Sequence, residues 1–212
     1  MSTASVPTTT TPDQATVLRG VTWDEYVRYR DDPANQGSRM TYYQGVLEIM
    51  TVSYFHELVS LLIHDFITLW RIHRNINVQP SGSMTLRSQL LEQGVEGDQS
   101  YYIEHAADVL GQVDIDIERF PPDLAIEINH TRASVPKMPI YAALGVPEVW
   151  RWRKETLSVL RLEDGQYIEQ TDSIALPGFP LDQLRNALSR RNEVSQTVLV
   201  REFQNGLAQS AS

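Results

Sequence analysis

Two carboxylates and one lysine, residue types that together can support phosphodiester hydrolysis, lie close together between residues 120 and 150. Asp123 and Glu127 alternate with apolar side chains, and Lys137 follows at the start of the next helical segment. Side chains alternate across a β-strand, so this pattern predicts a strand over Asp123–Asn129 with one acidic and one apolar face. The apolar face consists of Leu124, Ile126 and Ile128. Acids on a core strand near a lysine are typical of a metal-dependent phosphodiesterase site.

The same acids have a second interpretation, in which they face water at a sheet edge and perform no chemistry. Burying a carboxylate without a partner is costly, so an acidic face usually meets water, a cation or hydrogen-bond donors. Asp123 and Glu127 are about 13 Å apart along a strand that rises about 3.3 Å per residue. They are too far apart to bind one ion easily, and we expect Asp123 to have a structural role at the entrance of the strand.

The composition describes one globular domain without disulfides. The 212 residues include 42% hydrophobic residues and no cysteine, which is enough for a core of ordinary size. Polar residues interrupt the apolar run Leu58–Trp70, and the N-terminal segment lacks a basic region followed by an apolar core. We therefore expect a cytoplasmic protein without a membrane span. The net charge of −9 disfavours broad nucleic-acid binding, but clustered acids can recruit divalent cations.

The pattern of elements predicts an α/β (α+β) fold with a mixed sheet. Residues 1–16 predict a disordered tail, residues 17–190 the main domain, and residues 191–212 a helical or flexible tail. Thr22 and Glu25 predict a capping box that opens the first helix, whereas residues 88–97 predict a polar loop. Strands are expected at 40–50 (a pair), 76–87, 99–103, 123–129, 149–153, 158–162 and 166–170, and further helices at 136–144, 181–190 and 198–203.

A long amphipathic helix is predicted over Tyr54–Arg74, with Ser53 as its N-cap. Its apolar residues recur every three or four positions and define one buried stripe. His56 and His64 fall on a second stripe, about 12 Å apart, which is too far for one metal ion. We expect both histidines to belong to a polar helix face, with Glu57 between the two stripes.

Four sequence blocks resemble the Uma-type putative restriction endonuclease family, which is placed in the PD-(D/E)XK nuclease superfamily. The blocks are TYYQGVLEIMTVSYFHE (Thr41–Glu57), GDQSYYI (Gly97–Ile103), PDLAIEI (Pro122–Ile128) and KMPIYAALGVPEVWRW (Lys137–Trp152). The resemblance covers roughly residues 21–184 and implies a restriction-endonuclease-like mixed β-sheet flanked by helices. It also implies a divalent-metal site near a split in the sheet, with Mg²⁺ or Mn²⁺ as the cofactor and DNA as the partner.

The resemblance assigns catalysis to Asp98, Glu127 and Lys137, and metal binding to the two acids. Asp98 opens one strand and can approach Glu127 on a neighbouring strand across about 5 Å. The superfamily lysine is expected at position 129, where this chain has Asn129. In the subfamily that the chain resembles, the following helix supplies the lysine, at Lys137.

A further metal-binding acid is expected from either Glu48 or Glu57, and the sequence leaves this choice open. Glu57 fits the superfamily's helix-borne acid in position, whereas Glu48 belongs to the better-matched block. The chain also departs from the family, because Gly97 stands where proline is common and prolines at 136 and 139 flank Lys137. Two functions therefore follow from the sequence: an endonuclease that hydrolyses DNA, or a catalytically degenerate module that binds nucleic acid or protein.

The segment after this site alternates tryptophan with arginine. We expect Trp150 and Trp152 to lie in the core, and Arg151 and Arg153 to face the phosphates of a substrate. A homodimer would allow both strands of a duplex to be cut, but the sequence predicts neither the oligomeric state nor the recognition sequence.

Overall fold

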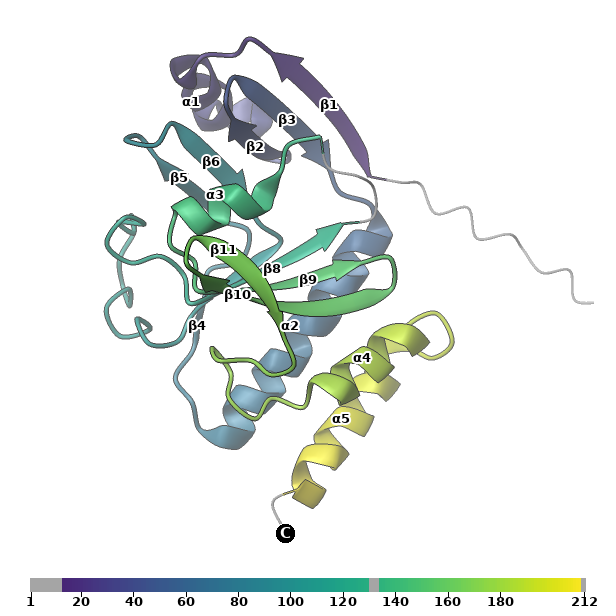
Figure 1. The fold of residues 1–212 in the computed structure, drawn as a ribbon. Coiled ribbons are helices and arrows are strands. Elements are labelled where there is room, and N and C mark those ends of the chain that lie inside the picture. The colour runs from purple at the N-terminus through teal and green to yellow at the C-terminus, as the bar shows by residue number, and fades with distance from the viewer. Residues whose placement is uncertain (1–12, 130–133, 211–212) are drawn as a thin grey trace, which may run out of the picture.

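A computed structural model describes residues 13–129 and 134–210, which form two β-sheets and the helices packed around them (Figure 1). The outer sheet is antiparallel and has the order β1-β3-β2-β6-β5. Its strands are β1 (Gln14–Arg19), β2 (Arg39–Tyr43), β3 (Val46–Thr51), β5 (Thr85–Ser88) and β6 (Gln93–Glu96). The helix α1 (Trp23–Asp31) packs on this sheet through Trp23 and Tyr26, and the predicted capping box of Thr22 and Glu25 is confirmed.

The central sheet is mixed and has the order β11-β10-β9-β8-β7-β4. Its strands are β4 (Gln79–Pro80), β7 (Gln99–Tyr102), β8 (Leu124–Asn129), β9 (Glu148–Arg153), β10 (Thr156–Glu163) and β11 (Gln166–Gln170). Only β8 and β9 pair in parallel among the described strands, and α3 (Lys137–Ala143) connects them. Parallel strands need such a crossover, because the chain must return to the starting end of the sheet before the next strand can run in the same direction. A tight turn can join only antiparallel strands.

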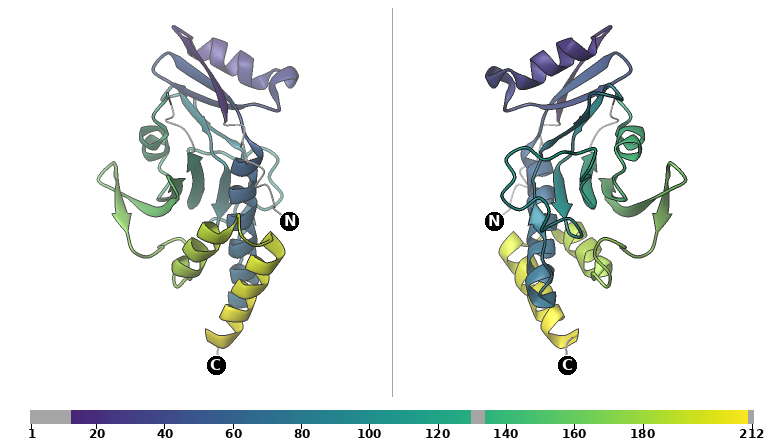
Figure 2. Two further views of the ribbon diagram at one scale, coloured as in Figure 1. Left: turned by 90° about the vertical axis from the view of Figure 1, so that its right-hand side faces the viewer. Right: turned by 90° about the vertical axis from the view of Figure 1, so that its left-hand side faces the viewer.

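Helices cover the central sheet on both faces. The helix α2 (Tyr54–Arg74) runs along one face together with α4 (Leu181–Arg190) and α5 (Gln196–Ser210), whereas α3 lies on the other face (Figures 1 and 2). The predicted interior position of β8 is confirmed, since Leu124, Ile126 and Ile128 pack in one core cluster with α2. In the part of the chain that the structure describes, no helix has the length and apolarity needed to cross a membrane.

The shortest link between the two sheets joins β6 to β7. β6 ends the outer sheet at Glu96, and β7 opens the central sheet at Gln99, so that only Gly97 and Asp98 lie between them. The β7–β8 ladder also ends here. Its last backbone hydrogen bond runs from the N–H of Asp98 to the carbonyl of Ile126, at 3.1 Å. This link is the point where the sheets diverge.

Two sequence predictions require correction. The disordered tail was predicted through residue 16, but Gln14–Arg19 forms β1, because these residues complete the hydrogen-bonding edge of β3; residues 1–12 lie outside the described residues. The loop predicted at 88–97 contains β6, because the polar Glu96 is buried and satisfied. Its carboxylate accepts the N–H of Met40 at 2.7 Å and pairs with Arg30 at 2.6 Å.

The C-terminal segment forms part of the main core. The helix α5 is longer than the predicted 198–203, because apolar side chains continue at the same helical spacing. Leu199, Phe203 and Leu207 are buried against α2, and the rings of Phe203 and Phe66 stack with centroids 4.0 Å apart. Truncation within this helix therefore exposes the face of α2 that supports β8.

Candidate active site at the junction of the sheets

The side chain of Glu127 is placed by the alternation of β8. Its neighbours Ile126 and Ile128 point to α2, so Glu127 points to the opposite face, where α3 packs. Glu127 is fully buried. A carboxylate in this position needs hydrogen-bond donors or a cation, which the elements around β8 provide.

The first turns of α3 supply two donors to Glu127. The ammonium of Lys137 lies 2.5 Å from its Oε1, and the hydroxyl of Tyr141 donates to its Oε2 at 3.0 Å. Lys137 and Tyr141 are one helical turn apart and therefore share a face of α3. The amide of Asn129 donates to Oε1 at 3.1 Å, so the residue at the expected lysine position contacts the same acid.

Gly97 makes room for the Tyr141 hydroxyl. A Cβ atom at position 97 would lie 2.4 Å from the Tyr141 Oη, which is closer than real Cβ contacts allow. Proline carries a Cβ as well, so the proline common in the family would collide with Tyr141 as it is placed in this chain. Any residue with a Cβ at position 97 would therefore require the Tyr141 hydroxyl to move.

Asp98 occupies the place where β7 separates from β8. The backbone N–H of Ile128 donates to Asp98 Oδ2 at 2.5 Å, so this carboxylate replaces the backbone acceptor that β7 no longer offers. Because Ile126 and Ile128 flank Glu127, the Asp98 carboxylate lies beside the Glu127 strand at the split between the sheets.

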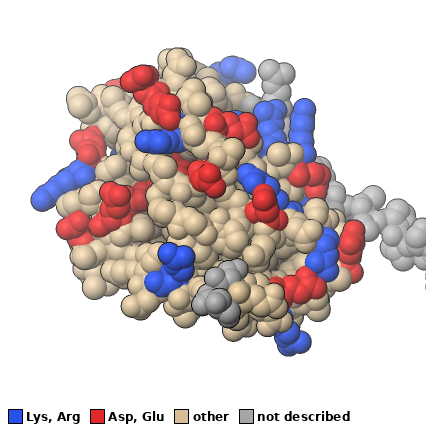
Figure 3. All heavy atoms as spheres, turned by 60° about the horizontal axis from the view of Figure 1, so that its bottom comes forward, with Lys and Arg blue, Asp and Glu red and all other residues tan. Residues whose placement is uncertain are grey.

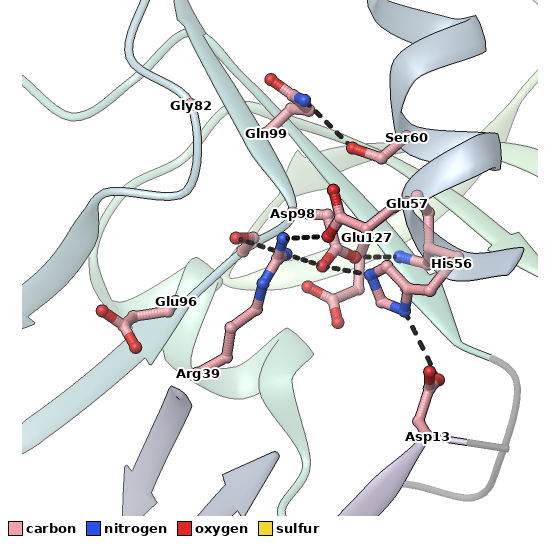
Figure 4. Close-up of polar contacts among 12 residues, drawn as sticks. Asp13, Arg39, His56, Glu57, Ser60, Gly82, Glu96, Asp98, Gln99 and Glu127 are labelled. Atoms are coloured by element: carbon pink, nitrogen blue, oxygen red, sulfur yellow. Dashed lines mark hydrogen bonds and ion pairs between the residues drawn. The ribbon is translucent and has the colours of Figure 1, made fainter. Parts of the chain in front are cut away.

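The other oxygen of Asp98 meets two cationic side chains (Figure 4). Its Oδ1 accepts from the guanidinium of Arg39 and lies 2.6 Å from His56 Nε2. The second ring nitrogen of His56 lies 3.4 Å from Asp13, which also accepts the N–H of Ser53 at the start of α2. Asp98 therefore joins the outer sheet, α2 and the segment before β1.

The two acids left open by the sequence lie on different sides of this cluster. Glu57 pairs with Arg39 at 3.0 Å, and so approaches Asp98 through the guanidinium (Figure 4). Glu48 is buried, accepts the N–H of Ser134 at 2.7 Å and contributes to the electrostatic environment of Lys137. Glu57 is the acid nearer to Asp98 through a shared partner, and Glu48 is the acid on the lysine side.

Burial and the local charges shift the pKa values of the site. Burial raises the pKa of Glu127, and the negative charge of Asp98 adds to this effect, whereas Lys137 opposes it. Burial also disfavours the Lys137 cation, but Glu127, Asp98 and Glu48 together raise its pKa above the ordinary value. Lys137 is therefore held as a cation in a buried position.

Asp98 and His56 stabilise each other's charged form. Burial opposes ionisation of Asp98, but the hydrogen bond and charge of His56, together with Lys137 and Arg39, lower its pKa. Burial likewise opposes protonation of His56, but its bonds to Asp13 and Asp98 raise the pKa to about 9. The imidazole is thus an internal cation at neutral pH.

Other residues singled out by the sequence lie at the edge of the site or outside it. Asp123 accepts the backbone N–H groups of Ile103, Glu104 and His105, which fits the expected structural role. Trp150 and Trp152 are buried in the core as predicted. Arg151 is the register partner of Glu127 on β9, and Arg153 is exposed at the end of that strand.

Several residues of this cluster were missed or misplaced from the sequence. His56 was assigned to a polar helix face but is buried, whereas His64 lies 3.1 Å from the Tyr101 hydroxyl. Arg39 and Asp13 carried no signal as site residues. The one available signal was the helical spacing of Lys137 and Tyr141, which places the hydroxyl beside the lysine.

The oxygen donors suit a small divalent cation. Asp98 and Glu127 provide carboxylates from neighbouring strands, and Mg²⁺ usually binds one or two carboxylates and completes its shell with water and phosphate oxygens. Within residues 13–129 and 134–210, no group of three or more His, Cys, Asp or Glu side chains is arranged to hold a metal ion. In the described structure, the Arg39 guanidinium bridges Asp98 to Glu57.

Comparisons with known proteins agree with this architecture. The family model Uma2, described as putative restriction endonuclease, matches residues 23–189. The chain is also similar to the crystal structure of a putative nuclease belonging to DUF820 from Anabaena variabilis ATCC 29413, with a TM-score of 0.51 and 12% identity over 76% of this chain and 92% of that chain. The comparison with curated proteins gave no match. The predicted fold class is confirmed.

Proposed function

Because the chain belongs to the Uma2, putative restriction endonuclease, family, we propose that it is a divalent-metal-dependent endonuclease that hydrolyses DNA phosphodiester bonds. The observation that carries the proposal is the buried contact of 2.5 Å between Lys137 and Glu127, beside Asp98 at the split between the sheets. A lysine and two acids are also the residue types that the resemblance assigns to catalysis. The proposed nuclease domain is the predicted region 17–190, extended to include all of β1 from Gln14 and the helix α5 to Ser210, which pack into the same fold.

In this proposal, Asp98 and Glu127 hold Mg²⁺ or Mn²⁺, and Glu57 or Glu48 supports the site. A divalent cation, when bound, supplies charge that holds the phosphate and lowers the pKa of an attacking water. Lys137 presents a fixed positive charge to negative charge that develops on the phosphate. Tyr141 fixes the orientation of the Glu127 carboxylate through its hydroxyl.

Contacts with DNA are expected close to the site. Lys and Arg are interspersed with Asp and Glu on the face drawn in Figure 3, so the described part of that face offers no broad positive surface. The net charge of −9 also disfavours extended binding to phosphates. We assign phosphate contacts to Arg151 and Arg153, because β9 lies directly beside the Glu127 strand.

The activity is tested by incubating supercoiled plasmid and single-stranded DNA with the protein and Mg²⁺, Mn²⁺ or EDTA. We expect cleavage that depends on the metal and is abolished in Glu127→Gln, which keeps the shape of the side chain but removes its charge. Metal-independent cleavage, or an equally active Glu127→Gln variant, would contradict the proposal. An RNA substrate of the same sequence tests the preference for DNA.

The second candidate function is a catalytically degenerate module that binds nucleic acid or a protein. The specific observation in its favour is that internal donors already meet both oxygens of Asp98. A pure protein that shifts labelled DNA in a gel but fails to cleave any tested substrate with any metal would favour this function.

A further inference from the structure

The Arg39 guanidinium lies between two acids of the candidate metal site. Arg39 is the first residue of β2, in the outer sheet, and its side chain extends toward the junction (Figure 4). One terminal nitrogen contacts Asp98 and the carbonyl of Gly97, and the other pairs with Glu57 at 3.0 Å. The guanidinium thus takes the bridging position that a metal ion shared by the two acids would take.

A divalent ion and Arg39 oppose each other at this position. Asp98 already receives positive charge from Arg39 and His56 on one oxygen and a backbone N–H on the other. A second cation on the same oxygens must replace a donor or bear its repulsion, which is strong between charges a few ångströms apart in a buried site.

Arg39 is the donor best able to leave. The N–H of Ile128 is fixed in the sheet, and His56 is fully buried on α2, between Asp98 and Asp13. The Arg39 side chain is 15% exposed, and its second partner, Glu57, is 44% exposed. A long side chain at the rim can turn toward solvent without moving a helix or a strand.

We propose that Arg39 competes with the divalent cation for Asp98 and Glu57. The Arg39 side chain must leave both acids before a metal ion can bind there. This inference rests on the proposed function, since Asp98 is one of the two acids proposed to hold the metal and Glu57 is one of the two proposed to support the site. Arg39 accordingly determines the metal affinity of the free protein. It also compensates the charge of the buried Asp98 when no metal is bound.

Titration calorimetry with Mn²⁺ and with Ca²⁺, which does not require cleavage, tests the inference on the full chain. The variants are Arg39→Gln and Arg39→Lys, and the matched control is Arg190→Gln, which removes an arginine paired with Glu202 on the surface. We expect Arg39→Gln to bind Mn²⁺ about tenfold or more tightly than the unchanged chain, Arg39→Lys to lie between them, and the control to remain unchanged. Circular dichroism and urea unfolding establish that the variants are folded.

Each outcome decides the question. Tighter metal binding in Arg39→Gln supports the competition, including the case in which only this variant binds. Equal or weaker binding, or no binding by any variant, overturns it. Cleavage of plasmid DNA is measured separately. Tighter metal binding by Arg39→Gln, with no cleavage by the unchanged chain or by any variant, would refute the proposed function alone. Equal metal affinities in a chain that cleaves would refute the competition alone.

Discussion

The Lys137 ammonium lies 2.5 Å from Glu127 Oε1, although the two residues come from a helix and a strand and are both buried. The pair closes one side of the candidate site, since Asp98 lies beside the same strand. A buried ion pair is weak evidence for stability, because desolvation offsets much of the attraction. Its position at the split between the sheets favours a catalytic role instead.

Replacing Lys137 with methionine should slow DNA cleavage by about 10²–10³-fold, because the fixed charge near the phosphate is lost. Metal affinity should remain unchanged or rise slightly, since a cation next to the acids has been removed. Cleavage rates and Mn²⁺ calorimetry on the same preparation measure both effects. The only other lysine, Lys154, lies in the exposed turn between β9 and β10, so Lys154→Met is the matched control. A rate for Lys137→Met equal to that of the control would remove the lysine from the mechanism.

Replacing Tyr141 with phenylalanine should lower cleavage by roughly 10–100-fold, because groups that orient a metal-binding carboxylate have effects of this size. The free energy of unfolding should fall by roughly 1–3 kcal/mol, because a buried acceptor loses its donor. Tyr167→Phe is the control, since its partly buried hydroxyl donates to the backbone carbonyl of Val146 at 2.7 Å rather than to an acid of the site. Both variants should lose stability in urea, but only Tyr141→Phe should lose activity; equal activities would show a purely structural hydroxyl.

Replacing Gly97 with alanine should destabilise the fold by roughly 1–3 kcal/mol, because the new methyl group meets the Tyr141 hydroxyl. The double variant with Tyr141→Phe should recover part of this loss, since the next ring atom is 3.5 Å away, an ordinary contact. A double-mutant cycle in urea measures the coupling between the two positions. Gly37→Ala, which meets no atom within 4 Å, should be nearly neutral. Strictly additive effects at positions 97 and 141 would show that the contact is not the cause.

The stabilisation provided by His56 should disappear as the pH rises. Its pKa is about 9 in the folded protein and about 6.5 when unfolded, a difference of roughly 3 kcal/mol. Because the folded state binds the proton more tightly, this contribution is fully present below about pH 6.5 and lost through pH 9. Urea unfolding of the unchanged chain and His56→Gln should therefore differ most at pH 6 and converge near pH 10. The exposed His73→Gln serves as a control, and a difference independent of pH would contradict the assigned charge.

The sequence predicted the elements whose patterns are local. The alternation in β8 and the spacing in α2 were sufficient to place these elements, because one face of each is apolar. The partners of Asp98 could not be predicted, because they come from residues 39, 56 and 128, and only the divergence of the sheets brings them together. Similarly, β6 was read as a loop, because Glu96 finds its partners on α1 and β2 rather than in its own segment.

The contacts of Asp13 give the outermost strand a connection to the candidate site. Asp13 directly precedes β1, and it holds both the start of α2 and the imidazole that contacts Asp98. Loss of the His56 contact with Asp98 would therefore also loosen Asp13, which lies directly before β1 at an edge of the outer sheet. Amide hydrogen exchange in β1 therefore reports, without any substrate, whether His56 still connects Asp13 to Asp98.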